Sequence, residues 1–469
     1  MSEGLEFSEV KASYLRVATP TLRFDPEYFQ AQHLKDESLI LARTQDFVSF
    51  EDLGLKVDAS AFYPSIEAHY GDGDLPFLRV ADVDSFIDFD GCTRIPSWLC
   101  DVHQTLARVN PGDILFTKGG SVARIGLVTE TAAVSRDLIF LNSSTLPRAD
   151  QAFLYLYSQS RFFNRMLLRS SSQTAQPHLT ITLVRDLRVL RASEEFKLHL
   201  LALVEATFAA SALAQEKLTQ SEQTLLNALG LKGWKAPEPL SYSRLSSEAF
   251  ASGRLDAQHF QPRFKYLTDF IEATGQANLL GSLLHENQRG KQPQYTDDGL
   301  RVVNSKHVLR GEVRLDEDNR RATYGDEDLL IHQGDVLMNG TGVGTIGRAA
   351  PYLHSDPAIP DNHVTILRPM SGLDAVYLSV FLNSMAGQWQ VEQRLRGSSG
   401  QIELYPTDIA QFKVWIAPPS VQSEIRRTVE KSYQQKQLSA QLLGSAIRAV
   451  EIAVADSEQA AVAYLETLK

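Results

Sequence analysis

Arginine is concentrated in one short stretch of the first half of the chain. Between residues 161 and 191, six arginines stand against a single acid, Asp186. Guanidinium groups bind phosphates or the edge of guanine, and glutamine amides bind adenine through paired hydrogen bonds. The stretch therefore predicts a DNA contact, and the alternative is an ordinary solvated helix face followed by a polar loop. The candidates are Arg165, Arg169, Gln173, Gln176 and His178.

Further polar and basic residues are candidates for the same contact. A loop in the second half contributes Arg394, Arg396, Ser398 and Gln401. A second set in that half consists of Lys291, Lys306 and His307. Two glycine-rich turns carry Lys118, Arg124, Asn339 and Thr341. These side chains are further candidates for DNA contact, and the alternative is an ordinary solvated loop or turn.

One glycine pattern formally matches a dinucleotide-binding site. Gly342, Gly344 and Gly347 spell G-x-G-x-x-G behind the strand-like segment VLMN. Such a site requires a helix directly after the glycines, so that the helix N-terminus meets the pyrophosphate. Here the sequence continues GRAAPYLHSDP, which Pro351 interrupts. The pattern therefore predicts a tight turn and no nucleotide cofactor.

Other catalytic patterns are incomplete. Gly290-Lys291 is followed by Gln292, not by the hydroxyl residue of a phosphate-binding loop. No Asn/Asp-Pro-Pro-Tyr/Phe segment is present to hold an adenine amine. Residues 195–197 spell the Glu-x-Lys of a metal-dependent nuclease, but they lie at a predicted helix start. The aspartates of residues 82–90 are interpreted as a solvated strand and turn. We therefore predict no catalytic residue, no metal ligand and no cofactor.

The elements that position the candidate residues recur in the two halves of the chain. LRFDPEYFQ and GRLDAQHFQ align Phe29 with Phe260, an offset of 231. The segments LPFLRV and DDGLRV, and then PGDILFTKGGSVARIG and QGDVLMNGTGVGTIG, align at an offset of 222. LRSSSQTAQPHLTITLVRDLRV and LRGSSGQIELYPTDIAQFKV align at 225. Four blocks in the same order at nearly constant offsets indicate a tandem duplication.

Each repeat has a front part of short strands and helices. The segments FLRVAD, GDILFT and IGLVTE in the first repeat, and LRVVN, GDVLMN and HVTILR in the second, are apolar runs bounded by turn residues. Such runs predict strands. QAFLYLYSQSRFFNRMLL and DAVYLSVFLNSMAGQWQVEQRL predict helices. The front part of each repeat is therefore expected to be an α+β globule.

A long helix is predicted behind each globule. Residues 193–229 contain no Gly or Pro, and the second helix opens at Pro418-Pro419-Ser420. Apolar residues recur at helical spacing in both, and each helix is about 50 Å long at the standard rise per residue. A narrow apolar seam of that length needs a partner helix, which the other repeat supplies. The alternative is that each helix packs on its own globule.

Composition limits the class of protein. The chain has 469 residues, 43% apolar and 22% charged, as in a soluble globular protein. The N-terminus is acidic without a following apolar run, so we expect a cytoplasmic protein with no membrane contact. Cys92 and Cys100 are interpreted as reduced structural residues. The net charge of −11 does not favour DNA binding by the chain alone, because affinity for phosphates comes largely from Lys and Arg.

One block carries a family resemblance. The loop of residues 396–401, RGSSGQ, is followed by an apolar run to Ala417, by Pro418-Pro419, and by Gln422 and Ile425 at the helix start. This order resembles the end of a target recognition domain in the specificity subunit of a type I restriction-modification enzyme. The first repeat departs from the pattern, with Ala175 in place of Gly and residues 191–193, RAS, in place of Pro-Pro.

The resemblance spans the chain and implies an α+β fold of two tandem target recognition domains, each followed by a long helix. The two helices are expected to pair as an antiparallel coiled coil. The implied segments are a first recognition domain (1–192), a first spacer helix (193–231), a linker (232–243), a second recognition domain (244–419) and a second spacer helix (420–469).

The resemblance also implies a function. A non-catalytic specificity subunit of this family reads a bipartite sequence in double-stranded DNA and directs adenine methylation and restriction by its partners. The implied partners are two methyltransferase subunits and the restriction/translocase subunits, and the methyltransferases are expected to supply most phosphate contacts. The alternatives are a DNA-recognition component of another phage-defence system, or a protein-interaction scaffold that does not read DNA.

Overall fold

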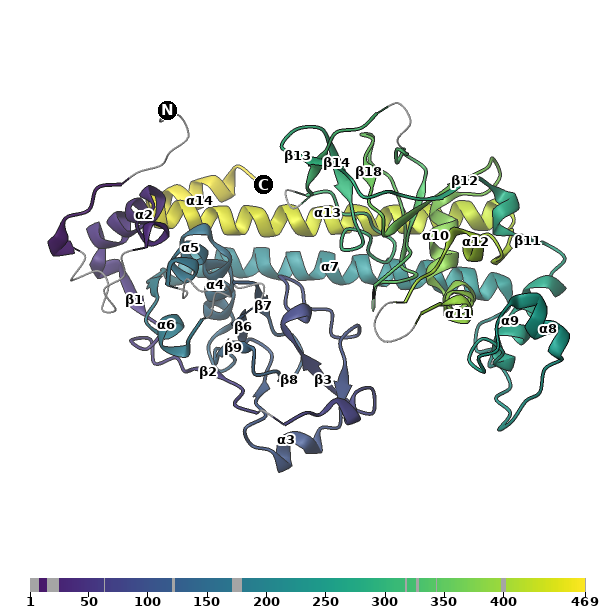
Figure 1. Ribbon diagram of the computed structural model, residues 1–469. Coiled ribbons are helices and arrows are strands. Elements are labelled where there is room, and N and C mark those ends of the chain that lie inside the picture. The colour runs from purple at the N-terminus through teal and green to yellow at the C-terminus, as the bar shows by residue number, and fades with distance from the viewer. Residues whose placement is uncertain are drawn as a thin grey trace. The chain divides into compact units, whose positions relative to one another are not determined.

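The computed structural model describes residues 8–14, 25–62, 64–119, 123–170, 179–316, 319–325, 329–342, 344–397 and 402–468. The chain forms two compact units. Unit 1 joins residues 1–211 to residues 437–469, and unit 2 is the continuous segment 212–436. Two long helices, α7 (Glu194–Leu229) and α13 (Pro419–Ala455), each contribute one half to each unit (Figure 1). Unit 1 is therefore discontinuous in sequence.

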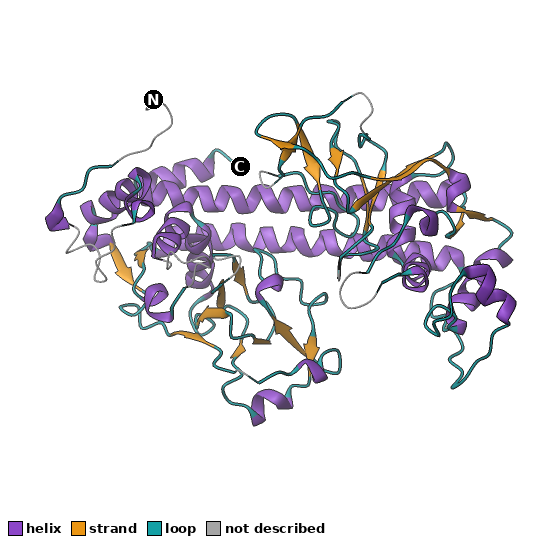
Figure 2. Ribbon diagram, in the orientation of Figure 1, coloured by secondary structure: helices purple, strands orange, loops and turns teal. Residues whose placement is uncertain are grey.

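Unit 1 contains three small sheets and a layer of helices (Figure 2). Its sheets have the strand orders β2-β9-β6-β7, β4-β3-β8-β5 and β1-β10. Its strands are β1 (Phe47–Ser49), β2 (Val57–Ala59), β3 (Leu75–Leu78), β4 (Arg94–Ile95), β5 (Arg108–Val109), β6 (Ile114–Thr117), β7 (Ile125–Leu127), β8 (Ala132–Val134), β9 (Leu138–Leu141) and β10 (Arg188–Leu190). Its helices besides α7 and α13 are α2 (Ala31–Ala42), α3 (Trp98–Val102), α4 (Arg148–Gln159), α5 (Arg161–Ser170), α6 (Ile181–Arg185) and α14 (Glu458–Glu466).

Unit 2 repeats this plan. Its sheets have the orders β12-β19-β16-β17, β13-β15-β14-β18 and β11-β20. Its strands are β11 (Ala277–Leu279), β12 (Leu284–Arg289), β13 (Tyr295–Thr296), β14 (Leu300–Val303), β15 (Arg321–Ala322), β16 (Val336–Asn339), β17 (Ala349–Pro351), β18 (Ile359–Pro360), β19 (Val364–Pro369) and β20 (Lys413–Trp415). Its helices are α8 (Ser246–Ser252), α9 (Pro262–Ala273), α10 (Ala375–Asn383), α11 (Met385–Arg394) and α12 (Pro406–Ile409).

The registers of the two units confirm the duplication. Ile114 pairs with Leu127 on one side and Leu141 on the other. In unit 2, Val336 pairs with Pro351 and Leu367 in the same way. The second sheet of each unit also contains one parallel pair, β3 with β8 and β14 with β18. The predicted α+β globules are therefore present twice, with the same core topology.

The recurring Gly-Asp pair forms the turn that starts the central strand of each unit. Gly112 and Gly334 have φ values of 97° and 95°, a left-handed conformation that favours glycine. The following aspartates, Asp113 and Asp335, are each 1% exposed. Each carboxylate accepts the backbone N–H of the residue three positions earlier, at 2.8 Å. The motif that repeats in the sequence therefore has a structural role, which is to fix the entry of β6 and of β16.

The long helices lie side by side and antiparallel in each unit. In unit 1, Ser193 at the start of α7 bonds Glu458 beyond the end of α13, and the Ser439 hydroxyl donates to the Thr207 carbonyl at 2.9 Å. In unit 2, the Ser432 hydroxyl donates to the Ala214 carbonyl at 2.7 Å. Both helices are long and apolar enough to cross a membrane by length and composition alone. Here their apolar side chains contribute to the cores of the two units.

The helix predicted over residues 420–469 is divided into two. α13 ends at Ala455, and α14 begins after Ser457, whose hydroxyl accepts the Ala460 N–H. The Arg43 guanidinium donates to the carbonyls of Ala453, Val454 and Asp456, at 3.1 Å in each case. These bonds satisfy carbonyls that the end of a helix leaves without partners. A side chain from the far end of the sequence thus caps α13 inside unit 1.

Candidate nucleic-acid interface

In each unit, the glycine-rich turn and the polar loop meet at one edge of the central sheet. In unit 1, the Leu179 N–H donates to the Lys118 carbonyl, and the Lys118 N–H donates to the Asp137 carbonyl, both at 2.9 Å. In unit 2, the Leu404 N–H donates to the Gly340 carbonyl at 2.9 Å, and the Gly340 N–H to the His363 carbonyl at 2.8 Å. We call these places the turn–loop edges. Their described residues are 59, 117–119, 123–124, 135–138 and 179–183 in unit 1, and 289, 339–342, 344–348, 361–364, 396–397 and 402–408 in unit 2.

The turn–loop edge of unit 1 carries two of the predicted DNA-contacting residues. Lys118 is half-buried and Arg124 is exposed. The Arg124 carbonyl accepts the Thr117 N–H at 3.0 Å, which closes the turn. Gln173, Gln176 and His178 lie outside the described residues. Of the residues predicted to contact DNA, the described part of this edge therefore contains two cations, Lys118 and Arg124, in the turn after β6.

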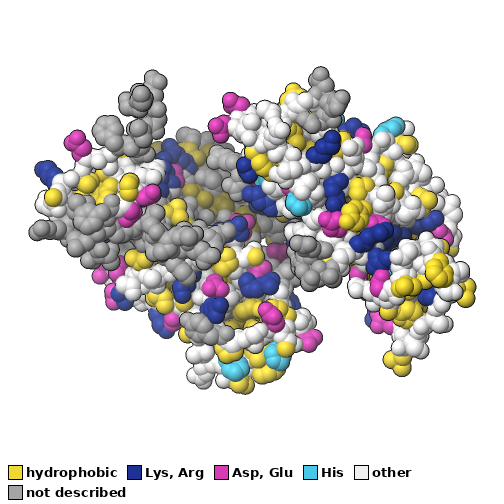
Figure 3. All heavy atoms as spheres, in the orientation of Figure 1, with side chains coloured by type: hydrophobic (Ala, Val, Ile, Leu, Met, Phe, Trp, Pro, Cys, Tyr) yellow, Lys and Arg dark blue, Asp and Glu magenta, His cyan; other side chains and the backbone are white. Residues whose placement is uncertain are grey.

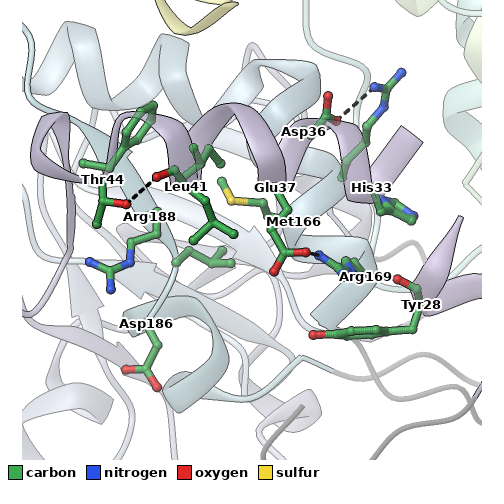
Figure 4. A pocket seen from close by; sticks show the side chains of 14 residues that line it. Tyr28, His33, Asp36, Glu37, Leu41, Thr44, Met166, Arg169, Asp186 and Arg188 are labelled. Carbon is green, nitrogen blue, oxygen red and sulfur yellow. Dashed lines mark hydrogen bonds and ion pairs between the residues drawn. The ribbon is translucent and has the colours of Figure 1, made fainter. Parts of the chain in front are cut away.

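The arginines of α5 serve a different purpose. Arg165 forms an ion pair with Asp36 at 3.0 Å. Arg169 forms one with Glu37 at 3.1 Å (Figure 4). The Arg169 guanidinium also lies 4.2 Å from the centre of the Tyr28 ring, and its side chain is only 10% exposed. The prediction that Arg165 and Arg169 contact DNA is therefore corrected. Their charges face acids of α2, and they hold α2 against α5.

The turn–loop edge of unit 2 has a richer set of side chains. The Thr341 hydroxyl and His363 Nδ1 lie 2.7 Å apart. Arg396 and Glu403 pair through their backbones at the base of the polar loop. The guanidinium groups of Arg289 and Arg396 lie 5.3 Å and 6.0 Å from the ring centre of Tyr405, which is 40% exposed. An exposed aromatic ring beside two arginines is a surface that suits a nucleobase.

Lys291 is exposed just beyond β12, in a groove of about 380 Å³ that Arg289, Gln292 and Tyr324 also line. Ser398 and Gln401 lie outside the described residues. On the face drawn in Figure 3, Lys and Arg side chains lie in small groups with acids among them. On this face, the positive charge of the described residues is therefore local.

Two other candidates, Asn339 and His307, are corrected because they are buried. Asn339 is fully buried, and its side-chain amide donates to the carbonyls of Ser305 and Val308 at 3.0 and 3.2 Å. His307 is 3% exposed, and its Nδ1 lies 3.0 Å from the Asn319 amide nitrogen. Both residues hold the segment that follows β14 in place. Lys306, next to His307, is exposed.

Arg394 also has an internal role. Its guanidinium donates to the carbonyls of Gln390 and Gln411 and lies 5.4 Å from the Phe412 ring centre. Burial lowers the pKa of Arg394 to about 10, so the group stays protonated at pH 7. Arg394 therefore joins the end of α11 to the segment before β20, and Arg396, two residues later, is the exposed arginine of the pair.

The G-x-G-x-x-G segment is the turn between β16 and β17, as predicted. Gly342, Gly344 and Gly347 have φ values of 98°, 79° and 80°. The element that follows is the strand β17, which pairs with β16. Among the described residues, no group of three or more His, Cys, Asp or Glu side chains could hold a metal ion.

Sequence reasoning missed part of the unit 2 edge. Tyr405, His363 and Asp408 were not assigned to it, although the partners of His363 and Asp408 lie only 22 and 12 residues away along the chain. One signal was available, since the segment ELYPTD places an aromatic residue between acids directly after the arginine loop. Aromatic residues beside arginine are typical of surfaces that bind nucleic acids.

Comparison with known proteins adds a likeness of fold. The S subunit of a type I restriction-modification system from M. genitalium matches over 87% of this chain and 94% of its own, with 13% identity and a TM-score of 0.38. The chain is similar to type I specificity subunits. The HsdS subunit from Thermoanaerobacter tengcongensis matches over 86% of this chain and 97% of its own, with 15% identity and a TM-score of 0.24.

A chain from a structure of the type I restriction-modification system matches over 88% of this chain and 97% of its own, with 15% identity and a TM-score of 0.27. No protein-family model matches the sequence, and no curated protein matches it.

Proposed function

We propose that the chain is the DNA-recognition subunit of a type I restriction-modification complex. It reads a bipartite target in double-stranded DNA and directs adenine methylation and restriction by partner subunits in the cytoplasm. The chain itself is non-catalytic. The observation that carries this proposal is that one backbone arrangement, in which a turn and a loop meet at a sheet edge, occurs twice with different exposed side chains. Two such surfaces on one chain suit a target with two different halves.

The two long helices supply the spacing in this proposal. Each helix enters both units without a break. A continuous helix is a rigid spacer of fixed length, because its rise per residue is constant. The length of the shared helices then sets the number of unread base pairs between the two half-sites.

The helix pair also offers a docking surface for the methyltransferase subunits. In unit 1, a groove of about 640 Å³ lies between α7 and α13 and is lined mainly by leucines. Leu198 is 58% exposed and Leu438 is 42% exposed. We propose one methyltransferase per repeat, with restriction/translocase subunits joining the same complex. The apolar lining suits a partner helix better than it suits the polar DNA backbone.

The proposal is tested by mapping methylated adenines in native cells with and without the gene. We expect one split motif, fully methylated in the parent strain, to lose its methylation in the deletion strain and to regain it when the gene is restored. Unchanged methylation of every split motif after deletion would contradict the proposal.

The acidic net charge predicts that DNA binding depends on the partners. Affinity for phosphates comes largely from cations that displace counterions, and this chain has 46 basic against 57 acidic residues. At physiological salt, we expect the purified chain to bind a duplex weakly and with little sequence preference until methyltransferase subunits are added. Fluorescence anisotropy with target and scrambled duplexes measures this. Tight, selective binding by the chain alone would show that the partners are not needed.

A further inference from the structure

The two turn–loop edges share a backbone but differ in the side chains that they display. Registers of the central sheets place Ala59 of β2 where unit 2 has Arg289 of β12. The residue before the short helix is Thr180 in unit 1 and Tyr405 in unit 2. Three residues later in each, Leu183 corresponds to Asp408. Two domains that recognise different half-sites require different side chains at equivalent backbone positions.

The most strongly oriented of the unit 2 side chains is Arg396. Its Nε donates to Asp408 Oδ2 at 3.1 Å, and its Nη2 donates to Asp408 Oδ1 at 2.7 Å. The Arg396 side chain is 51% exposed, whereas the Asp408 side chain is 11% exposed. Asp408 therefore holds the guanidinium edge formed by Nε and Nη2. The other edge, formed by Nη1 and the second hydrogen of Nη2, is the outer edge, and no described residue accepts its hydrogens.

We propose that Arg396 reads a guanine in the half-site of unit 2 through this outer edge, and that Asp408 is the positioning residue that holds it. The inference rests on the proposed function, because it assigns one base of the target that the chain is proposed to read. Guanine presents two acceptors, O6 and N7, in the major groove, and a guanidinium edge matches them with two hydrogen bonds.

A phosphate is the less suitable partner for Arg396. The Asp408 carboxylate offsets the charge of the guanidinium, so the pair contributes little to counterion release. The same carboxylate fixes the direction of the remaining donors, which matters for base recognition and not for a diffuse contact with the backbone. Tyr405 lies beside the arginine and limits its movement on one side.

The test maps methylation motifs in native cells that carry Arg396→Ala, Arg396→Lys or Asp408→Asn in the full chain. We expect Arg396→Ala to reduce the preference for guanine at one position of one half-motif roughly 5- to 150-fold, the value of one paired contact. Arg396→Lys keeps the charge but not the two-donor edge, so we expect it to behave like the alanine variant. Asp408→Asn is expected to give an intermediate loss of preference.

Arg427→Ala is the matched control, because Arg427 is an exposed arginine of α13 whose replacement changes the net charge equally. It should leave every base preference unchanged. The other half-motif should also stay intact in all variants, which confirms that the chains are folded and assembled. Thermal unfolding of the purified variants gives a second check on Asp408→Asn.

Three results distinguish failure of this inference from failure of the proposed function. If the parent strain shows a split motif that depends on the gene, and Arg396→Ala leaves all its bases equally specified, the inference is wrong and the proposed function stands. Rescue of the preference by Arg396→Lys would also overturn it, because lysine supplies charge without the paired geometry. If no motif depends on the gene, the proposed function itself fails.

Discussion

Asp335→Ala is expected to lower the free energy of unfolding by about 3 kcal/mol. Asp335 is 1% exposed, and its carboxylate accepts two hydrogen bonds from Arg368, at 2.7 and 2.9 Å, and one from the His332 N–H. Removing it leaves a guanidinium without its partner in a mostly buried place. The Arg368 side chain is 32% exposed, which places the loss at the lower end of the range for broken buried pairs. Urea unfolding of the purified chain measures it.

Asp113→Ala is the matched control, since Asp113 occupies the same place in unit 1. Among the described residues, its carboxylate accepts backbone N–H groups alone, from Asn110 and Ser144, at 2.8 and 2.9 Å. We expect a smaller loss of about 2 kcal/mol, the cost of leaving buried donors unsatisfied. Equal losses in the two variants would mean that the ion pair with Arg368 adds nothing to stability.

Ala214→Leu is expected to destabilise the helix pair of unit 2 by about 1–3 kcal/mol. Ala214 is 1% exposed on α7, and its carbonyl accepts the Ser432 hydroxyl of α13 at 2.7 Å. A contact so close to the backbone leaves no room for three more carbon atoms. The added side chain forces the helices apart and breaks the hydrogen bond. Thermal unfolding and circular dichroism follow the change.

Ala212→Leu provides the comparison for that variant. Ala212 lies two residues earlier on the same helix and is exposed. Leucine and alanine have similar helix propensities, so the free energy of unfolding should change by less than about 0.5 kcal/mol. If both variants lose stability equally, the small residue at position 214 is not required for close packing.

The sequence was informative where local chemistry decides the structure. Gly112 and Gly334 adopt conformations that glycine prefers, and the apolar runs behind them form the predicted central strands. The long helices were predictable because apolar residues recur at helical spacing in both segments and because the first segment contains no Gly or Pro. The duplication was visible for the same reason, because both copies must satisfy the same turns and the same register.

The roles of individual polar residues depended on partners far along the chain. Arg165 and Arg169 looked free because their acids, Asp36 and Glu37, lie about 130 residues earlier, on α2. Asn339 is of a residue type that is common in surface turns, but it is fully buried. Spacing along a sequence does not reveal which polar groups satisfy each other across a fold, so the internal roles of these residues follow only from the structure.

The discontinuity of unit 1 has a consequence for synthesis. Translation proceeds at roughly 5–20 residues per second, and domains generally fold as units as they emerge. Unit 2 is a continuous segment and is complete in the nascent chain before unit 1, which must wait until residues 437–469 have left the ribosome. Until then, the half of α7 that belongs to unit 1 lacks its companion and exposes apolar side chains. A chaperone that shields nascent chains would be most needed in that interval.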